Sequence, residues 1–411
     1  MTVGVVLGSL VFVVPGVANA DPASCFDRTA AATVSERRVD LAAPQELLRR
    51  SGFDRYAPRF ERVLCSLRSA RAASEAVRNE GPALWRAAVD RVQGRGPAGG
   101  DLSRGDDRPL YWTRLQFTRD LRQWKPSFPL SAAQRTALVN ALETGSRGQD
   151  SVTYPSGVRR VLVSGFDPFQ LDADIRRSNP SGANVLALDG LTLSTPQGPV
   201  RVETAMFPVL YQPFEEGMVE HTFLPYIRNV DMLMTVSQGR IGRIDVERTN
   251  GRWHTGPDND NSNRAATIPI PVDVPTVTPQ PEWVTTTLPY TKIVAATTGR
   301  FPVFDNTSVT EIRSGETVPV ISPNGPTPGS VARAGTGGSY LSNEIAYRAT
   351  LLRDATRPSL PAGHVHTPVL EFGPGNTTQV TDPVFEQNRT DIVTQMRAIL
   401  TVAVGNVVPA V

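Results

Sequence analysis

Apolar side chains in the first third of the chain recur every three or four residues, the spacing that gathers them on one face of a helix. The stripes comprise Phe60, Val63, Leu64 and Leu67; Leu84, Trp85, Ala88, Val89 and Val92; Leu110, Phe117, Leu121 and Trp124; and Leu138, Val139 and Leu142. Ser131 followed by Gln134 makes a capping-box pattern before the last stripe. We interpret the stripes as core faces rather than partner-binding surfaces, and expect a mostly α-helical domain over residues 21–150.

Two glycine-rich stretches interrupt this pattern. The segment from Gly94 to Gly105 is rich in glycine and arginine, and we expect a surface loop there. The segment from Gly145 to Gly157 is polar and rich in glycine and serine. We place the domain boundary in this second stretch.

After Arg159 the pattern changes to short apolar runs that alternate with helical segments. This alternation predicts an α/β domain over residues 158–405, with a mainly parallel twisted sheet flanked by helices. A proline- and threonine-rich segment, Pro257 to Pro289, is expected to be a long irregular excursion. The expected strands are Val161–Val163, Asp231–Val236 and Lys292–Ala296, and the expected helices are Ser342–Arg353 and Asp382–Val402.

The N-terminus has the pattern of a signal peptide. Residues 3–17 are almost entirely apolar and are followed by Ala18-Asn19-Ala20, which indicates cleavage before Asp21 and a signal peptide over residues 1–20. The positively charged start of a signal peptide is missing, and a buried N-terminal strand is the alternative. An uncleaved anchor fits less well, because the apolar run is about 15 residues and a span needs roughly 20. We therefore expect an exported bacterial protein, extracellular or associated with the cell wall.

The chain has two cysteines, Cys25 and Cys65. A pair in an exported protein predicts a disulfide, which would close a loop of about 40 residues and stabilise the fold by roughly 2–4 kcal/mol. Two buried free thiols are the alternative. Neither cysteine is expected to be a nucleophile, because no histidine or acidic motif accompanies it.

Length and composition exclude some classes of function. With 411 residues, the chain is long enough for two domains. Its hydrophobic content of 40%, charged content of 20% and net charge of +2 are ordinary for a globular protein and do not indicate a nucleic-acid partner. No membrane association is expected after signal cleavage. The oligomeric state is left open, a homo-oligomer included.

Four motifs in the second half carry the candidate chemistry. Gly165-Phe166-Asp167-Pro168-Phe169 follows a strand, in the position where α/β proteins bind ligands, although both phenylalanines could equally pack the core. Glu247 and Arg248 close the second motif and, taken alone, would be a solvated surface pair. The motifs are Gly165–Phe169 with Asn179-Pro180-Ser181, Ser237–Arg248, Thr336–Tyr347, and Gly363–Pro368.

In their order and residues, these motifs resemble pyroglutamyl peptidase I, a family of cysteine peptidases. The resemblance covers about residues 158–405. It implies that Phe166 and Phe169 sandwich the pyrrolidone ring of a pyroglutamyl substrate, with Asn179 in the same substrate site. It also implies that His366 is the catalytic histidine and that Glu247 orients it.

The sequence departs from the family at several positions. Ser342 replaces the nucleophilic cysteine, Thr255 stands where the family has an arginine, and Glu344 replaces a histidine. Gln170 and Ser237 replace glycines, and His364 occupies an apolar position. Because Ser342 precedes a helix, developing negative charge is favoured there, but a serine still needs a general base.

The favoured interpretation is a secreted hydrolase with a Ser342-His366-Glu247 triad that cleaves an N-terminal pyroglutamyl or related amide from a small peptide. It needs no cofactor. We predict no metal site, because we expect His364 and His366 to point to opposite faces of their strand. One alternative is an inactive relative that binds rather than cleaves. Another makes the helical domain the functional part, attached to a wall or partner.

Overall fold

The computed structural model describes residues 25–407, so the expected signal peptide lies outside the described residues. The first part of the chain is helical, and its capping box at Ser131 is confirmed. A disulfide joins Cys25 to Cys65, with 5.8 Å between the Cα atoms, and ties the start of the described chain to α3. The elements are α1 (Val34–Arg38), α2 (Ala42–Ser51), η2 (Phe53–Arg55), α3 (Tyr56–Ser66), α4 (Ala70–Val92), α5 (Arg108–Gln123) and α6 (Ala132–Gly145).

The second part is built around a seven-stranded sheet in the order β10-β5-β14-β4-β1-β3-β2. The pairs β14–β5 and β2–β3 are antiparallel, and the other neighbours are parallel. The expected fold class, a mainly parallel sheet with flanking helices after a helical region, is confirmed. The strands are β1 (Arg159–Phe166), β2 (Thr192–Thr195), β3 (Gly198–Phe207), β4 (Met232–Gln238), β5 (Ile244–Glu247), β10 (Val303–Asn306) and β14 (Ala362–Thr367).

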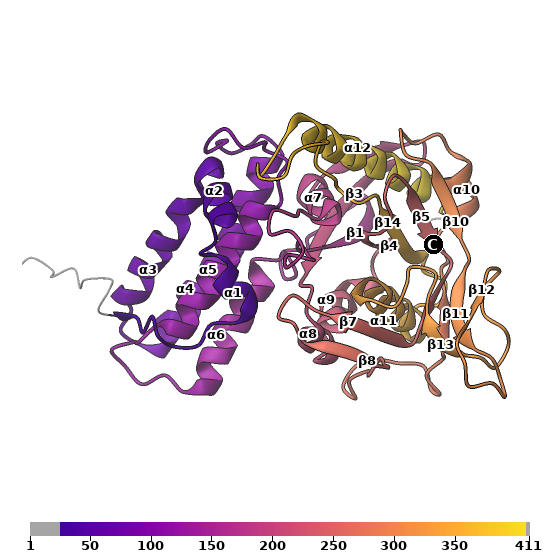
Figure 1. Ribbon diagram of the computed structural model, residues 1–411, viewed down its shortest axis with the longest axis horizontal. Helices are drawn as coiled ribbons and strands as arrows, with labels where there is room; N and C mark the ends of the chain where they lie inside the picture. The colour runs from indigo at the N-terminus through magenta and orange to yellow at the C-terminus, as the bar shows by residue number, and fades with distance from the viewer. Residues whose placement is uncertain (1–24, 408–411) are drawn as a thin grey trace, which may run out of the picture.

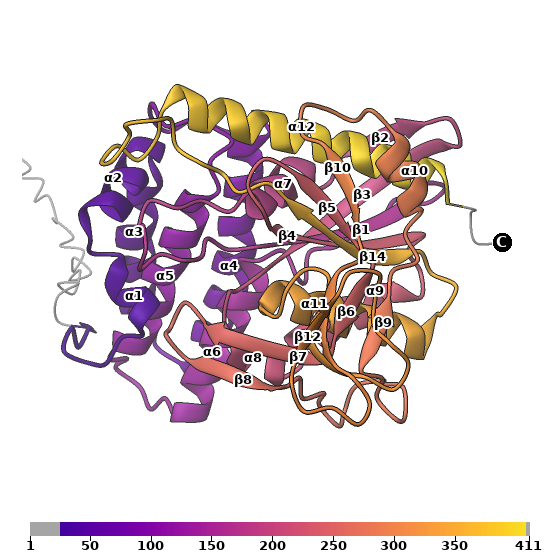
Figure 2. The same cartoon turned by 45° about the vertical axis from the view of Figure 1, so that its right-hand side comes forward.

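Helices cover both faces of this sheet (Figures 1 and 2). One face carries α7, α10 and α12, and the other carries α8, α9 and α11. The helix α11 packs on β4 and β14, so its N-terminus lies over the central strands. The helices are α7 (Pro180–Leu188), α8 (Tyr211–Glu215), α9 (Met218–Ile227), α10 (Tyr290–Ala295), α11 (Leu341–Thr356) and α12 (Pro383–Gly405).

Two sequence-based expectations about this part are wrong. Lys292–Ala296 was expected to be a strand but belongs mostly to α10, because an apolar run this short has no periodicity to separate strand from helix. The excursion from Pro257 to Pro289 is not wholly irregular, since it contains two short strands. It holds β8 (Asn263–Thr267), paired with β7 (Trp253–Pro257), and β9 (Trp283–Thr285), paired with β6 (Thr249–Gly251).

A further small sheet follows α10, with the order β12-β11-β13. It consists of β11 (Val309–Ile312), β12 (Val320–Ser322) and β13 (Val331–Ala334), and the sequence analysis did not anticipate it. These short strands lack the apolar runs that marked the central sheet.

The helical region and the α/β region share one hydrophobic core. A continuous cluster of buried side chains runs from Leu47 and Phe117 in the helices to Val163 in β1 and Ile399 in α12. Across the same boundary, the Trp85 indole N–H of α4 donates a hydrogen bond to Asp189, which follows α7. The two regions therefore bury apolar surface against each other, in addition to the surface that each buries internally.

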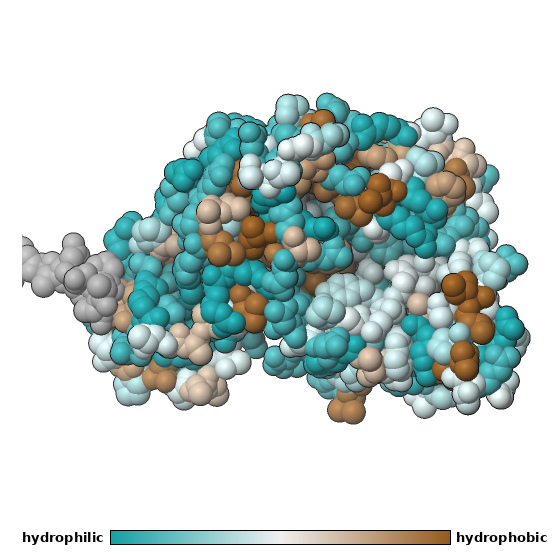
Figure 3. Space-filling view, in the orientation of Figure 1, coloured by the Kyte–Doolittle hydropathy of each residue, from teal (hydrophilic) through white to brown (hydrophobic). Residues whose placement is uncertain are grey.

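No helix among residues 25–407 is long and apolar enough to cross a membrane. On the face drawn in Figure 3, apolar side chains form separate spots between hydrophilic ones. The large exposed apolar residues are likewise dispersed over several loops and short strands, for example Ile241, Val272 and Ile321.

Candidate active site

A row of buried polar side chains crosses the central sheet. The backbone register aligns Ser164 of β1 with Thr235 of β4, Thr235 with His364 of β14, His364 with Glu247 of β5, and Glu247 with Asn306 of β10. Residues aligned in this way project to the same face of a sheet. The sheet therefore brings together polar groups from five strands that are far apart in the sequence.

Glu247 and His366 form a hydrogen-bonded pair within this region. The Nδ1 atom of His366 lies 2.7 Å from Glu247 Oε1, and the two side chains are buried. The other carboxylate oxygen accepts a hydrogen bond of 2.9 Å from Asn306 Nδ2, which also donates to the Thr336 carbonyl. A carboxylate held in this way fixes the imidazole orientation and leaves Nε2 as the nitrogen that can take up a proton.

Two glycines make room for the His366 ring. A Cβ atom added at Gly239 would lie 2.6 Å from His366 Cβ, and one added at Gly337 would lie 2.5 Å from His366 Cε1. Real Cβ atoms do not approach other atoms so closely. Both glycines belong to motifs that the sequence analysis identified, and the structure shows the steric reason for them.

Ser342 is the second residue of α11 and lines a small cavity that is open to the surface. The residue before the helix, Tyr340, provides no side-chain cap, so its side chain does not engage the first backbone N–H groups of the helix. Within residues 25–407 the Ser342 hydroxyl makes no hydrogen bond, including none to His366. The cavity is lined by Phe166, Phe169, Asn179, Val209, Ser237, Gln238, Tyr340, Leu341 and Ser342.

The aromatic residues of the first motif lie at this cavity in different environments. Phe166 is only 3% exposed and packs against Phe207 and Phe214, so it belongs to the core as well as to the cavity wall. Phe169 is partly buried and stacks on Tyr340, with 6.0 Å between the ring centroids. The sequence analysis gave no role to Tyr340, although it lies within the third motif.

The side chain of Asn179 also lines the cavity, but its amide is engaged by the protein. Its Nδ2 group donates to the Asp167 carbonyl at 2.9 Å, and its Oδ1 accepts from the backbone N–H of Ser181 at 3.1 Å. Asn179 is thereby the N-cap of α7. It connects the start of this helix to the end of β1.

The expectation that His364 and His366 point to opposite faces is wrong. Residues two apart on a strand share a face, and the two rings are 4.6 Å apart. His364 lies 2.8 Å from the Thr235 hydroxyl and 2.7 Å from the Ser237 hydroxyl, one at each ring nitrogen. Burial, together with the neighbouring His366, lowers the pKa of His364 well below its ordinary value, so His364 stays neutral.

Glu344, in the first turn of α11, belongs to a buried network of hydrogen bonds and ion pairs. One carboxylate oxygen lies 2.6 Å from His254 Nδ1, and the other accepts from Arg348 Nε at 2.9 Å. Arg348 also pairs with Glu220 at 3.0 Å. A negative charge so close to Ser342 would otherwise oppose an anion at the helix N-terminus.

Sequence reasoning missed Asn306 and His254 as members of this site. Asn306 lies in β10, in a segment without a recognised motif, and His254 precedes the Pro257 segment. Neither gives a clear sequence signal, since Asn306 lies between Asp305 and Thr307 and His254 lies between Trp253 and Thr255. These local sequences do not identify a partner more than fifty residues away.

Residues 18–143 match the model of the PA0049 N-terminal domain, and residues 160–280 and 300–371 match that of the PA0049 C-terminal domain. An uncharacterized protein of Pseudomonas aeruginosa, PA0049, is 34% identical over 507 aligned residues, which cover 93% of this chain and 91% of that protein.

Several solved structures are similar to about three-fifths of the chain. Pyroglutamyl peptidase I of Bacillus amyloliquefaciens is 18% identical, with a TM-score of 0.42, and the match covers 60% of this chain and 98% of that one. A mutant pyrrolidone carboxyl peptidase of Pyrococcus furiosus is 20% identical, with a TM-score of 0.40 and coverages of 59% and 97%. The pyrrolidone carboxyl peptidase of Thermococcus litoralis is 17% identical, with a TM-score of 0.39 and coverages of 59% and 94%.

Proposed function

The chain belongs to the PA0049 protein family, and we propose that it is a secreted serine hydrolase that cleaves an N-terminal pyroglutamyl group or a related small amide. Ser342 is the nucleophile, His366 the general base and Glu247 the residue that orients His366. The substrate lies in the cavity beside Phe166 and Phe169. This assignment combines the motif resemblance with the local geometry of the described residues.

The chemistry follows from the roles of the three side chains. The Ser342 hydroxyl attacks the amide carbonyl while His366 Nε2 takes its proton, and His366 then gives this proton to the leaving amine. A water molecule then attacks the acyl-serine while His366 takes its proton, and His366 returns this proton to the Ser342 oxygen as the acid leaves. The N-terminal N–H groups of α11 stabilise the negative charge on the carbonyl oxygen.

One observation carries the proposal. Glu247 and His366 are 119 positions apart in the sequence, yet their side chains form a buried hydrogen bond of 2.7 Å beside the motif that contains Ser342. Gly337, five residues before Ser342 in the same motif, leaves the space that the His366 ring occupies. Such an orienting carboxylate is a feature of catalytic histidines.

The disulfide supports the secreted part of the proposal. Disulfides form and persist in oxidising compartments, and the Cys25–Cys65 bond lies directly after the expected cleavage site. An exposed catalytic thiol is prone to oxidation in such compartments. A serine at position 342 avoids that reaction, which gives the exchange of cysteine for serine a chemical reason.

A second candidate function, ligand binding without catalysis, is favoured by a different observation. In the described residues the Ser342 hydroxyl is not hydrogen bonded to His366. A serine without its base is a weak nucleophile. In this case the cavity would hold a small lactam-like ligand and leave it intact.

Covalent labelling by a fluorophosphonate probe tests the serine assignment. We expect the wild type and the neighbouring control Ser339→Ala to be labelled, and Ser342→Ala not to be labelled. His366→Asn should slow labelling by about 10²–10⁴-fold, because the general base is lost. Absence of labelling in the folded wild type would reject the hydrolase and favour the binding protein.

A dye-releasing pyroglutamyl amide, compared with the corresponding prolyl amide, tests the substrate class. Preference for the pyroglutamyl compound is expected, because the prolyl amine is charged and no carboxylate is among the residues that line the cavity. Labelling at Ser342 without release from either amide would retain the nucleophile and reject the substrate assignment.

A further inference from the structure

The wall of the candidate cavity depends on an irregular segment, the loop of residues 167–179 between β1 and α7. It carries Phe169 and ends at Asn179, and it directly follows Phe166. A loop of this length has a large conformational entropy when it is not held by contacts. The contacts that hold this loop therefore determine the position of the cavity wall.

Two arginines of the helical region bind the first residue of this loop. Arg114 of α5 lies 2.8 Å from one carboxylate oxygen of Asp167, and Arg147, just after α6, pairs with the other oxygen. All three side chains are at most 3% exposed. Two buried arginines on one carboxylate fix its position, because each charge-assisted hydrogen bond has a preferred direction.

Asp107, just before α5, binds the other end of the loop. One of its carboxylate oxygens accepts a hydrogen bond from the Ser178 hydroxyl, and the other accepts from the backbone N–H of Asn179 at 3.1 Å. Burial and the adjacent charge of Asp106 raise the pKa of Asp107 to about 6. The carboxyl group accordingly lies in a dry environment in which its hydrogen bonds are not replaced by water.

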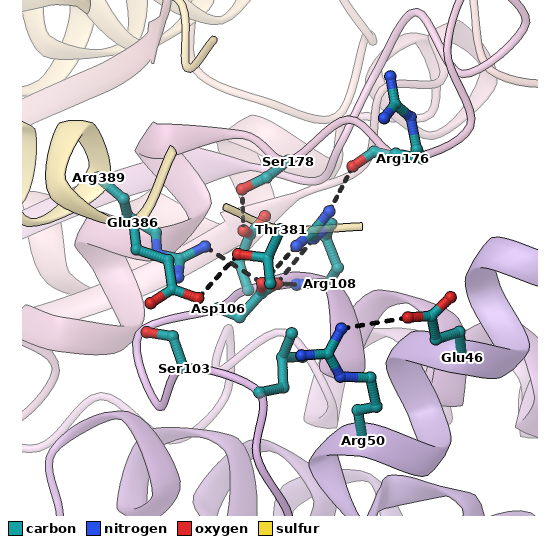
Figure 4. Close-up of polar contacts among 12 residues, drawn as sticks. Glu46, Arg50, Ser103, Asp106, Arg108, Arg176, Ser178, Thr381, Glu386 and Arg389 are labelled. Carbon is teal, nitrogen blue, oxygen red and sulfur yellow. Dashed lines mark hydrogen bonds and ion pairs between the residues drawn. The ribbon is translucent and has the colours of Figure 1, made fainter. Parts of the chain in front are cut away.

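Figure 4 shows how the neighbouring ion pairs extend this connection. Arg108 pairs with Asp106 and donates to the carbonyl of Arg176 in the loop, while Arg389 of α12 lies 3.1 Å from Asp106. The start of α5 is thus joined both to the loop and to the C-terminal helix.

A third connection lies in the middle of the loop. Arg38 of the helical region lies 2.6 Å from the Asp172 carboxylate and also donates to the Asn259 carbonyl. Asn259 in turn donates from its side chain to the Pro168 carbonyl at 2.8 Å. The helical region therefore contacts the loop at its beginning, middle and end.

We propose that the helical region is a positioning element of the active site, which holds the loop of residues 167–179 so that Phe166, Phe169 and Asn179 form the substrate cavity. The proposal uses the cavity assigned under the proposed function, but the loop contacts stand independently of catalysis. Arg147, Arg114 and Asp107 are positioning residues, because they act on the substrate only through the loop. Buried ion pairs often add little net stability, so we assign to these pairs the placement of the loop.

The test compares Arg147→Met with Arg91→Met in the full chain. Arg91 is an equally buried arginine of the helical region, 2% exposed, but it binds carbonyl groups of residues 98–104 and not the loop. Hydrogen exchange of residues 167–179 is measured below the melting temperature of both variants. We expect Arg147→Met to speed exchange in the loop by about tenfold, and Arg91→Met to leave it within about twofold of the wild type.

If Arg147→Met does not fold, a second pair of variants with smaller changes is compared. Ser178→Ala removes one hydrogen bond to Asp107, and Ser51→Ala removes a buried hydroxyl that bonds within α2. Only Ser178→Ala should speed exchange in the loop, by about threefold to tenfold. Unchanged loop exchange in Ser178→Ala, or an equal change in both members of either pair, overturns the proposal.

Kinetics on the hydrolysed amide distinguish positioning from general destabilisation. Loosening the cavity wall should raise KM while the rate of fluorophosphonate labelling at Ser342 stays within about twofold. Equal losses of labelling and of substrate affinity would show that the loop does not act on the cavity specifically. If the protein does not hydrolyse the amides, the proposed function fails, while the exchange experiment still decides the role of the helical region.

Discussion

At the scale of single residues, the site gives two adjacent histidines different properties through their partners. His366 lies against a carboxylate, whereas His364 lies between two hydroxyl groups. A carboxylate stabilises a protonated imidazole, but hydroxyl groups in a dry environment do not. The same strand therefore holds one histidine that a carboxylate orients and one that stays neutral.

The buried carboxyl group of Asp120 should make the stability of the fold depend on pH. It is 2% exposed, and burial, together with the charge of Glu61, outweighs the nearby Arg28 and raises its pKa to about 7 from an ordinary value of 3.8. The folded state then binds the proton more tightly than the unfolded state does. The stability from this group is present below pH 3.8 and is lost as the pH rises through about 7.

Asp120→Asn should remove this loss of folding stability at higher pH. We expect the melting temperature of the variant, relative to that of the wild type, to increase between pH 4 and pH 7, as measured by calorimetry at several pH values. The exposed control Asp54→Asn should show no such trend. A constant difference between Asp120→Asn and the wild type across this range would contradict the raised pKa.

At the scale of elements, the turn before α11 joins Ser342 to the other two members of the proposed triad. Thr336 accepts at its carbonyl from Asn306, which also binds Glu247, and Gly337 lies against the His366 ring. Ser342 follows within the same short segment. A displacement of this turn would therefore move all three parts of the triad relative to one another.

Gly337→Ala tests this arrangement. The added Cβ would lie 2.5 Å from His366 Cε1 and 3.4 Å from Glu247 Cδ, so the imidazole must shift. We expect fluorophosphonate labelling to fall by about 10²-fold or more, because a general base works only at hydrogen-bond distance. In the control Gly96→Ala the new Cβ makes ordinary contacts of 3.4 Å, and labelling should be unchanged. Normal labelling of Gly337→Ala would show that His366 is not the base.

At the scale of the whole molecule, the two regions behave as one structural unit. A single hydrophobic cluster spans both, and the ion pairs of Asp167 and Asp106 lie between them. Separating the regions would expose apolar surface and leave buried charges without partners. The domain boundary expected within residues 145–157 stays a prediction, and the regions on its two sides pack against each other.

Calorimetry tests whether the two regions unfold together. We expect one cooperative unfolding transition for the full chain under oxidising conditions, with equal calorimetric and van't Hoff enthalpies. Reducing the Cys25–Cys65 bond should lower the free energy of unfolding by about 2–4 kcal/mol without splitting the transition. Two separate transitions would show that the helical region unfolds independently.

The local sequence was sufficient for the parts of the fold that depend on local periodicity. The helical stripes of α3 to α6 follow from residue spacing, the capping box follows from Ser131 and Gln134, and the strands β1 and β4 follow from apolar runs that alternate with helical segments. The short strands β5, β6 and β9 and the helix α10 did not, because runs of a few residues carry no period and their structure depends on the partners with which they pair.

For the site, the sequence by itself determined the motifs, the serine at position 342 and the candidate roles of Glu247 and His366. Only the tertiary structure decided that Asn306 supports Glu247, that Thr235 and Ser237 flank His364, and that Arg114, Arg147 and Asp107 hold the cavity loop. The physical reason is that spacing along the chain determines which face of a strand or helix a residue occupies. Which distant charge or amide meets it there depends on sheet order and on the packing of the helical region against the sheet.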